Sequence, residues 1–188
     1  MEDLFDFQAL RVQQPGKLLA NRAEYEIFNA ERQLLAIAVA SEHHARLGLI
    51  SKAMPDTTAL AVTKPAGELV LSLVMRRNDW ITDVHGPASE LLGRIRTGGS
   101  RRHYTLLNDQ DEAVGTVVGD LGLKKFSAAD NEGARFGQVR KTWAGFKKEM
   151  LTSSDHYKVE FTGPVSQLVR VLTVMMPIVL DLTLYEPV

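Results

Sequence analysis

The sequence predicts a mainly β protein, a closed antiparallel barrel of about twelve strands around a hydrophobic helix near the C-terminus. Three observations predict it. Turn signals recur at short intervals from Leu10 to Phe161, one hairpin pattern repeats, and a single long apolar segment follows the strands. Spacing of about 8–12 residues between turn signals is typical of sandwiches and barrels. Roughly eleven or twelve strands leave room for a central helix, whereas eight are filled by their own side chains.

The repeated hairpin is marked by an aromatic residue, an Asn or Asp, and a small residue in one fixed register. Its three copies are Tyr25, Asn29 and Ala36; Tyr104, Asn108 and Gly115; and Phe126, Asp130 and Gly137. We expect a strand to begin at the aromatic residue, a turn at the Asn or Asp, and a return strand to carry the small residue. A looser copy runs from Ile81 to Gly93. Small residues on return strands indicate either bends or a closely packed partner.

The apolar segment extends from Val165 to Leu184, and no residue between Val171 and Leu180 is charged. A plausible helix start with Pro164 at its first position predicts a helix over about residues 164–180. Apolar side chains cover about two-thirds of its circumference, so protein or lipid must enclose it. The remaining narrow face must find polar partners; it consists of Ser166, Arg170, Thr173 and Pro177.

Three enclosures are open for this helix: the barrel interior, a membrane that it spans, and a membrane that it enters reversibly. The uncharged run from Val171 to Leu180 is shorter than the roughly 20 residues that a membrane span needs. After Asp181, the sequence Leu182-Thr183-Leu184-Tyr185 alternates like a last strand. A membrane anchor is not normally followed by a strand that must rejoin the domain, which favours the barrel interior.

Composition limits the classes of function. The 188 residues suit one domain, 1–188, and the 22 basic and 23 acidic residues give no global field that would attract nucleic acid. The absence of cysteine excludes disulfides, thiolate catalysis and palmitoylation. The N-terminus lacks a secretory signal, so we expect a cytoplasmic protein. No nucleophile paired with a base and no phosphate-cradling loop is present, and we do not expect an enzyme.

The last third of the chain carries a family resemblance. Its residues are Gly137-Gln138-Val139-Arg140-Lys141-Thr142-Trp143, Lys148-Glu149-Met150-Leu151-Thr152, Asp155-His156-Tyr157-Lys158-Val159, Leu180-Asp181 and Leu184-Tyr185-Glu186. The sequence resembles the phospholipid scramblase family and the related LURP-one proteins, which share the Tubby C-terminal-like fold. The resemblance implies a twelve-stranded barrel around a hydrophobic helix. It also implies binding or movement of phospholipids at the cytoplasmic face of a membrane, here the inner face of the plasma membrane.

The calcium loop that the resemblance implies is poorly kept. Only Asp155 retains a family acid, while Ser153 and Pro164 stand where the pattern has carboxylates. Calcium prefers six to eight oxygen ligands. Asp155 and Glu160 are therefore weak calcium candidates, and no other cofactor is expected. The alternative function is a soluble, non-enzymatic module that binds a protein or small ligand without lipid transport.

Basic pairs are the candidates for a lipid-binding surface. They are Arg76-Arg77, Arg101-Arg102, Lys124-Lys125, Arg140-Lys141 and Lys147-Lys148. On a barrel these pairs could converge at one rim and hold an anionic headgroup; the alternative is dispersed charge that solvates the surface. The stretch from Arg140 to Lys148 is the strongest candidate because Trp143 and Phe146 interleave with its charges. The candidate lipid-binding residues are Arg101, Arg102, Arg140, Lys141, Trp143, Lys147 and Lys148.

Overall fold

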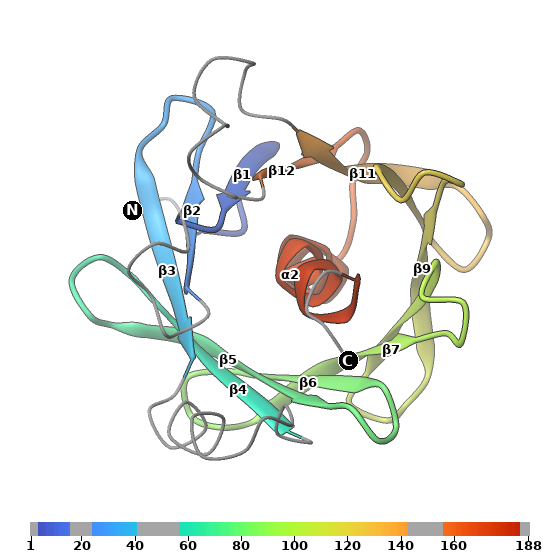
Figure 1. Cartoon of the computed structure of the whole chain (residues 1–188), viewed down its shortest axis with the longest axis horizontal. Helices are drawn as coiled ribbons and strands as arrows, with labels where there is room; N and C mark the ends of the chain where they lie inside the picture. The colour runs from blue at the N-terminus through green and yellow to red at the C-terminus, as the bar shows by residue number, and fades with distance from the viewer. Residues whose placement is uncertain (1–3, 16–23, 41–56, 143–155, 185–188) are drawn as a thin grey trace.

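The computed structural model describes residues 4–15, 24–40, 57–142 and 156–184, which form a closed barrel around one helix (Figure 1). Each of the twelve strands in these residues pairs antiparallel with the strands before and after it, and β1 closes the barrel against β12. The strands are β1 (Ala9–Gln13), β2 (Glu24–Phe28), β3 (Leu34–Ala40), β4 (Thr57–Thr63), β5 (Leu69–Arg76), β6 (Ile81–His85), β7 (Leu91–Thr97), β8 (His103–Asn108), β9 (Ala113–Gly119), β10 (Lys125–Ala129), β11 (Arg135–Thr142) and β12 (His156–Phe161). The fold class that the sequence predicts is confirmed.

Alternate residues of the strands point into the barrel. In β2 the side chains of Tyr25 and Ile27 are buried, while the residues between and beside them are only half-buried. In β12 the same alternation buries Tyr157, Val159 and Phe161. Because side chains alternate between the two faces of a strand, this period of two gives each strand one apolar face for the core.

The three repeated hairpins have the same type of turn, as the sequence predicts. In each, the side-chain oxygen of Asn29, Asn108 or Asp130 accepts a hydrogen bond of 2.8 Å from the backbone N–H four residues on. The aromatic residue of each copy lies directly opposite the residue two places beyond the small one. The Asn or Asp therefore fixes the turn and, through it, the strand register.

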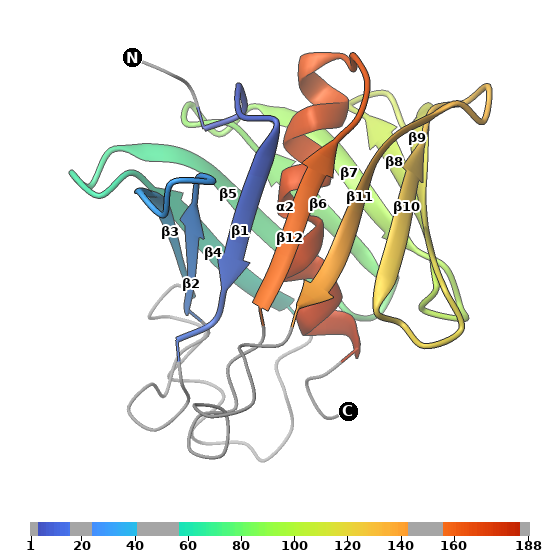
Figure 2. The same ribbon diagram turned by 90° about the horizontal axis from the view of Figure 1, so that it is seen from above.

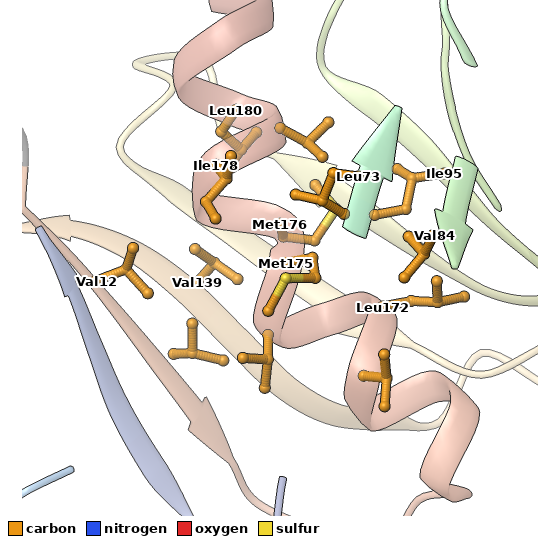
Figure 3. Packing of buried hydrophobic residues seen from close by; sticks show 14 of the residues in the cluster. Val12, Leu73, Val84, Ile95, Val139, Leu172, Met175, Met176, Ile178 and Leu180 are labelled. Carbon is orange, nitrogen blue, oxygen red and sulfur yellow. The ribbon is translucent and has the colours of Figure 1, made fainter. Parts of the chain in front are cut away.

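Helix α2 (Gln167–Leu184) runs through the middle of the barrel (Figures 1 and 2). Leu172 and Met175 have no exposed surface, and Figure 3 shows them among strand side chains that include Leu73 and Val84. Of the three possible enclosures for the apolar segment, the structure shows the barrel interior.

Gly93 on β7 marks a close approach between the barrel wall and the helix. A Cβ atom there would lie 3.1 Å from Leu168 Cδ1, 3.4 Å from Leu172 Cδ1 and 2.5 Å from the Leu107 carbonyl oxygen. Glycine is therefore required by packing at this position. At Gly115 and Gly137, as at Gly93, the closest atom to an added Cβ is a backbone oxygen on the neighbouring strand, but there none of the three nearest atoms belongs to the helix.

The predicted start of the helix is wrong by three residues. The helix begins at Gln167 and not at Pro164, because Ser166 provides the N-cap. Its hydroxyl accepts a hydrogen bond of 3.3 Å from the Val169 N–H, and its carbonyl accepts one of 3.0 Å from the Arg170 N–H. A serine oxygen at this position satisfies a backbone donor that has no partner within the helix.

The predicted end of the helix is also wrong. Leu182, Thr183 and Leu184 continue the helix and do not form the start of a strand, while Tyr185 lies outside the described residues. Four residues of alternation are too few to distinguish a strand from a helix, and enclosure of the segment by the barrel favours a helix, whose hydrogen bonds are satisfied internally. The Thr183 hydroxyl donates a hydrogen bond of 2.7 Å to the Val179 carbonyl oxygen, so this buried polar group has a partner within the helix.

The narrow polar face of the helix finds the partners that it requires. The Arg170 guanidinium donates 3.0 Å to the Phe7 carbonyl oxygen and lies 4.2 Å from the centre of the Phe161 ring. The Thr173 hydroxyl donates 2.7 Å to the Val169 carbonyl oxygen. The polar groups that enter the barrel are thus bonded, as buried polar groups must be.

Candidate lipid-binding end of the barrel

The charges of the barrel separate along its axis. Since neighbouring strands are antiparallel, all odd-numbered strands finish at the end where helix α2 also finishes (Figure 2). We call this the basic end, because the described basic pairs lie on or beside its turns: Arg76-Arg77, Arg101-Arg102, Lys124-Lys125 and Arg140-Lys141. The pairs thus converge at one rim.

The opposite end, which we call the acidic end, carries mostly carboxylates in its turns. These acids are Glu31, Glu68, Glu90, Asp109, Asp111, Glu112, Asp130 and Glu132, alongside the bases Arg32 and Lys64. Within the described turns, where Asp79 and Asp120 are the acids of the basic end, the two ends therefore carry net charges of opposite sign, although the net charge of the chain is only −1. A total charge near zero excludes a strong field of one sign around the whole protein, but it does not exclude a separation of charge between the two ends.

Arg101, a lipid-binding candidate, is bound to the end of helix α2. Its guanidinium donates 3.2 Å to the Thr183 carbonyl oxygen and lies 4.5 Å from the centre of the Trp80 ring. A cation is stabilising at a helix C-terminus because the unpaired carbonyls there carry partial negative charge. Arg101 is therefore held by the fold, and only part of its donor capacity remains for a ligand.

Two aromatic residues of the repeat also hold this end of the helix. The Tyr25 hydroxyl donates 2.8 Å to Asp181 Oδ2, and Asp181 is only 2% exposed. The Tyr104 hydroxyl donates 2.9 Å to the Arg101 carbonyl oxygen and lies 3.2 Å from Thr183 Oγ1. The end of the helix is thus fixed by polar contacts, whereas its middle is held by apolar packing.

Arg102 and Lys141 also contact the barrel. The Arg102 Nη2 atom donates 3.3 Å to the Gly119 carbonyl oxygen, which ties β8 to the end of β9. Lys141 Nζ lies 5.9 Å from the centre of the Tyr157 ring. Both side chains are half-buried, so their charges sit at the rim with their stems against the wall.

Glu160 lies among cations and donors on the outer wall. Its carboxylate forms ion pairs with Lys158 Nζ at 2.6 Å and Arg140 Nη2 at 3.0 Å. It also accepts a hydrogen bond of 2.9 Å from Gln138 Nε2. The hydrogen bond from Lys158 is the largest of the causes that lower the pKa of Glu160 below its ordinary value. Both oxygens are thus engaged by donors, which is not the setting of a calcium ligand.

The remaining candidates lie outside the described residues: Trp143, Lys147, Lys148 and Asp155. Among the residues that the structure does describe, no group of three His, Asp or Glu side chains is placed to hold a metal ion. Calcium binding at Asp155 and Glu160 therefore stays a prediction.

A row of cations that the sequence does not reveal crosses the outer wall near the basic end. Lys125 lies directly opposite Arg140, Arg140 opposite Lys158, and Lys158 opposite Arg11. These four residues, which we call the basic stripe, stand on the adjacent strands β10, β11, β12 and β1 (Figure 2). Two of them are remote in sequence from any basic pair, so only the strand register could have found them.

The basic stripe is electrostatically costly to the fold. Like charges directly opposite one another destabilise a sheet. Glu160 offsets Arg140 and Lys158, but Arg11 and Lys125 are exposed and form no ion pair within the described part of the chain. An anionic ligand would relieve this repulsion.

A second feature missed by the sequence analysis is Leu121, at the tip of the turn between β9 and β10. Its side chain is 88% exposed at the basic end. The sequence shows the turn but not that this leucine fails to reach the core.

Comparison with models of protein families identifies the family of this chain. The model of the family described as Scramblase matches residues 59–187, more than half of the chain. The chain belongs to the scramblase family. The match begins in β4 and includes helix α2 and every member of the basic stripe except Arg11.

A solved structure supports the barrel fold. An X-ray structure of a protein from Arabidopsis thaliana is similar with a TM-score of 0.53, covering 91% of this chain and 90% of that one. At 12% identity this likeness shows the fold alone. A comparison with curated protein sequences found no match.

Scramblase family membership suggests association with phospholipids and membranes. In the described residues, one helix, Gln167–Leu184, is long and apolar enough to cross a membrane, but 78% of it is buried in the barrel.

Proposed function

We propose that this scramblase-family protein binds anionic phospholipids through the basic end of the barrel, as a peripheral protein at the cytoplasmic face of the plasma membrane. The observation that carries the proposal is the basic stripe. Its four side chains form one continuous row, and two of them have no ion-pair partner in the described residues.

The strength of such binding follows from the lipid charge. Basic residues close to an anionic leaflet contribute about 1 kcal/mol each, and the attraction fades over about 8–10 Å in physiological salt. The basic stripe and the basic pairs of the basic end lie within this distance of the lipid at the same time only if the basic end faces the membrane. The acidic end then points into the cytoplasm, where repulsion from the lipid is smallest.

Movement of phospholipids between leaflets is a further activity that the family implies. It needs a polar path for headgroups across the apolar layer, which a single apolar helix does not offer. Helix α2 would also have to leave the barrel and expose side chains such as Leu172 and Met175, which are fully buried. We therefore propose lipid binding as the function of this form. The scramblase family is not known as an enzyme family, and we propose no catalytic step.

Co-sedimentation with vesicles tests the proposal. We expect the protein to pellet with phosphatidylcholine vesicles that contain phosphatidylserine, to stay in solution with phosphatidylcholine alone, and to be released by high salt. Lys125→Glu should weaken binding, whereas Arg135→Glu, which reverses an exposed charge on β11 at the acidic end, should not.

The opposite result favours the alternative function. If the folded protein ignores anionic vesicles at low salt and moves no labelled lipid with or without calcium, the lipid proposal fails. The barrel is then better explained as a soluble module that binds a protein or small ligand.

A further inference from the structure

Leu121 is the most exposed large apolar side chain in the described residues. It is 88% exposed, compared with 42% for Val118 and 37% for Leu69. A single exposed leucine is common on soluble proteins and needs no explanation by itself. Its surroundings decide whether it has a function.

The turn that carries Leu121 is held rigid by Asp120. One carboxylate oxygen of Asp120 accepts hydrogen bonds from the Lys124 N–H at 2.9 Å and the Lys125 N–H at 3.3 Å. The Asp120 carbonyl oxygen accepts a third, from the Leu123 N–H, at 3.2 Å. The tip is thus ordered before it meets a ligand, which lowers the entropy cost of binding.

Asp120 is also the only acid within the turn, and its charge is directed at backbone. The hydrogen bond from the Lys124 N–H is the largest cause that lowers the pKa of Asp120, so the carboxylate stays ionised and turned toward the amides. The cations Lys124 and Lys125 are exposed beside it. The tip therefore presents an apolar side chain next to positive charge.

The tip adjoins the basic stripe. Lys125, the first residue of β10 directly after the turn, is the first member of the stripe, and β10, β11, β12 and β1 follow one another around the barrel wall (Figure 2). Val118, three residues before Leu121 near the end of β9, is the next most exposed large apolar side chain in the described residues. Apolar side chains flanked by cations are the arrangement that settles at the interface of an anionic bilayer.

A bilayer suits this feature better than a protein does. Leu121 stands on a convex tip, and a protein partner would need a pocket of complementary shape to bury it. A bilayer accepts a single protruding side chain without such a pocket. The charges around the tip are those that anionic headgroups attract.

We infer that the β9–β10 turn is the membrane-inserting element of this protein, with Leu121 entering the acyl boundary of an anionic bilayer while the basic stripe binds the headgroups. The inference rests on the proposed function and adds to it the orientation of the barrel and the side chain that enters the lipid.

The absence of native cysteine allows a direct test. Leu121→Cys is labelled with an environment-sensitive fluorophore, and Leu69→Cys, at the acidic end, is the matched control. On addition of phosphatidylcholine vesicles that contain phosphatidylserine, we expect a blue shift and rise in emission at position 121 and no change at position 69. Co-sedimentation without an emission change at position 121, or an equal change at both positions, overturns the inference.

Unlabelled variants provide the second measurement. Leu121→Asn should weaken partition to the same vesicles by about tenfold, as expected for loss of a partly inserted leucine. Leu69→Asn should leave partition unchanged, and equal melting temperatures exclude misfolding as the cause. If the wild type binds and Leu121→Asn binds equally well, the insertion is refuted while the proposed function stands. If the wild type does not bind at all, the proposed function itself has failed.

Discussion

The Tyr25 hydroxyl donates a hydrogen bond of 2.8 Å to Asp181 Oδ2, across 156 positions of the chain. Tyr25 opens the first copy of the repeated hairpin, and Asp181 lies in the last turn of the central helix. The repeat and the helix, which look independent in the sequence, therefore meet at the basic end. This hydrogen bond opposes sliding of the helix along its own axis. Apolar packing alone opposes such sliding only weakly.

Tyr25→Phe should lower the free energy of unfolding by about 1–3 kcal/mol, because it removes a donor from a buried carboxylate. Tyr104→Phe should cost less, about 0.5–1.5 kcal/mol, since its hydroxyl serves neutral partners. Denaturant unfolding of both variants measures the difference. Equal losses for the two variants would show that the Asp181 contact has no special weight.

Gly93→Ala should destabilise the barrel by about 1–3 kcal/mol, because the added methyl group would overlap the Leu107 carbonyl oxygen and crowd Leu168. Gly99→Ala is the control, since a Cβ atom there meets nothing within 4 Å. We expect the control to change stability by no more than about 0.5 kcal/mol. If thermal unfolding shows the two variants to be alike, the helix does not approach β7 as closely as described.

Arg101→Ala should act on stability and Lys125→Ala on lipid affinity. Arg101 binds the end of helix α2 and the Trp80 ring, so its loss should cost about 1–2 kcal/mol of unfolding free energy. Lys125 has no ion pair in the described residues, and its loss should weaken vesicle binding by about fivefold without lowering stability. An Arg101→Ala protein of unchanged stability would contradict the conclusion that Arg101 stabilises the end of helix α2.

Glu160→Gln should strengthen binding to anionic vesicles by about fivefold, because it removes the carboxylate that pairs with Arg140 and Lys158 of the basic stripe. It should also flatten the acid limb of the stability curve. The pKa of Glu160 is lowered in the folded state, so its contribution is present above its ordinary value of 4.5 and is lost as the pH falls through the folded pKa. Below about pH 4.5 the wild type should therefore lose stability more steeply than the variant. Parallel curves would show that the Glu160 contacts contribute nothing to folding.

The fold was predictable because its signals are local. The Asn or Asp of each hairpin determines a turn by a hydrogen bond within five residues, and the apolar run of the helix is visible in a window of one segment. The helix ends were not predictable in the same way. The helix continues past Asp181 inside the barrel, where that buried carboxylate accepts a hydrogen bond from Tyr25, a residue remote in sequence.

The candidate site was predictable only in part. Adjacent basic residues are visible in the sequence, and antiparallel topology brings the described pairs to one end. The basic stripe depends on which residues of β10, β11, β12 and β1 face one another, and the closure between β1 and β12 joins Arg11 to Lys158 across most of the chain. The exposure of Leu121 likewise depends on where the β9–β10 turn ends relative to the core.

The central claim is that the basic end of the barrel, and not its apolar helix, meets the membrane. Hydrogen exchange across the whole chain, with and without phosphatidylserine-containing vesicles, tests it most directly. We predict that vesicles slow exchange in peptides from the basic end, including residues 120–125, while peptides from helix α2 are strongly protected to the same extent in both conditions. Rapid exchange of the helix in solution, or a change in its protection on vesicles, would contradict the claim.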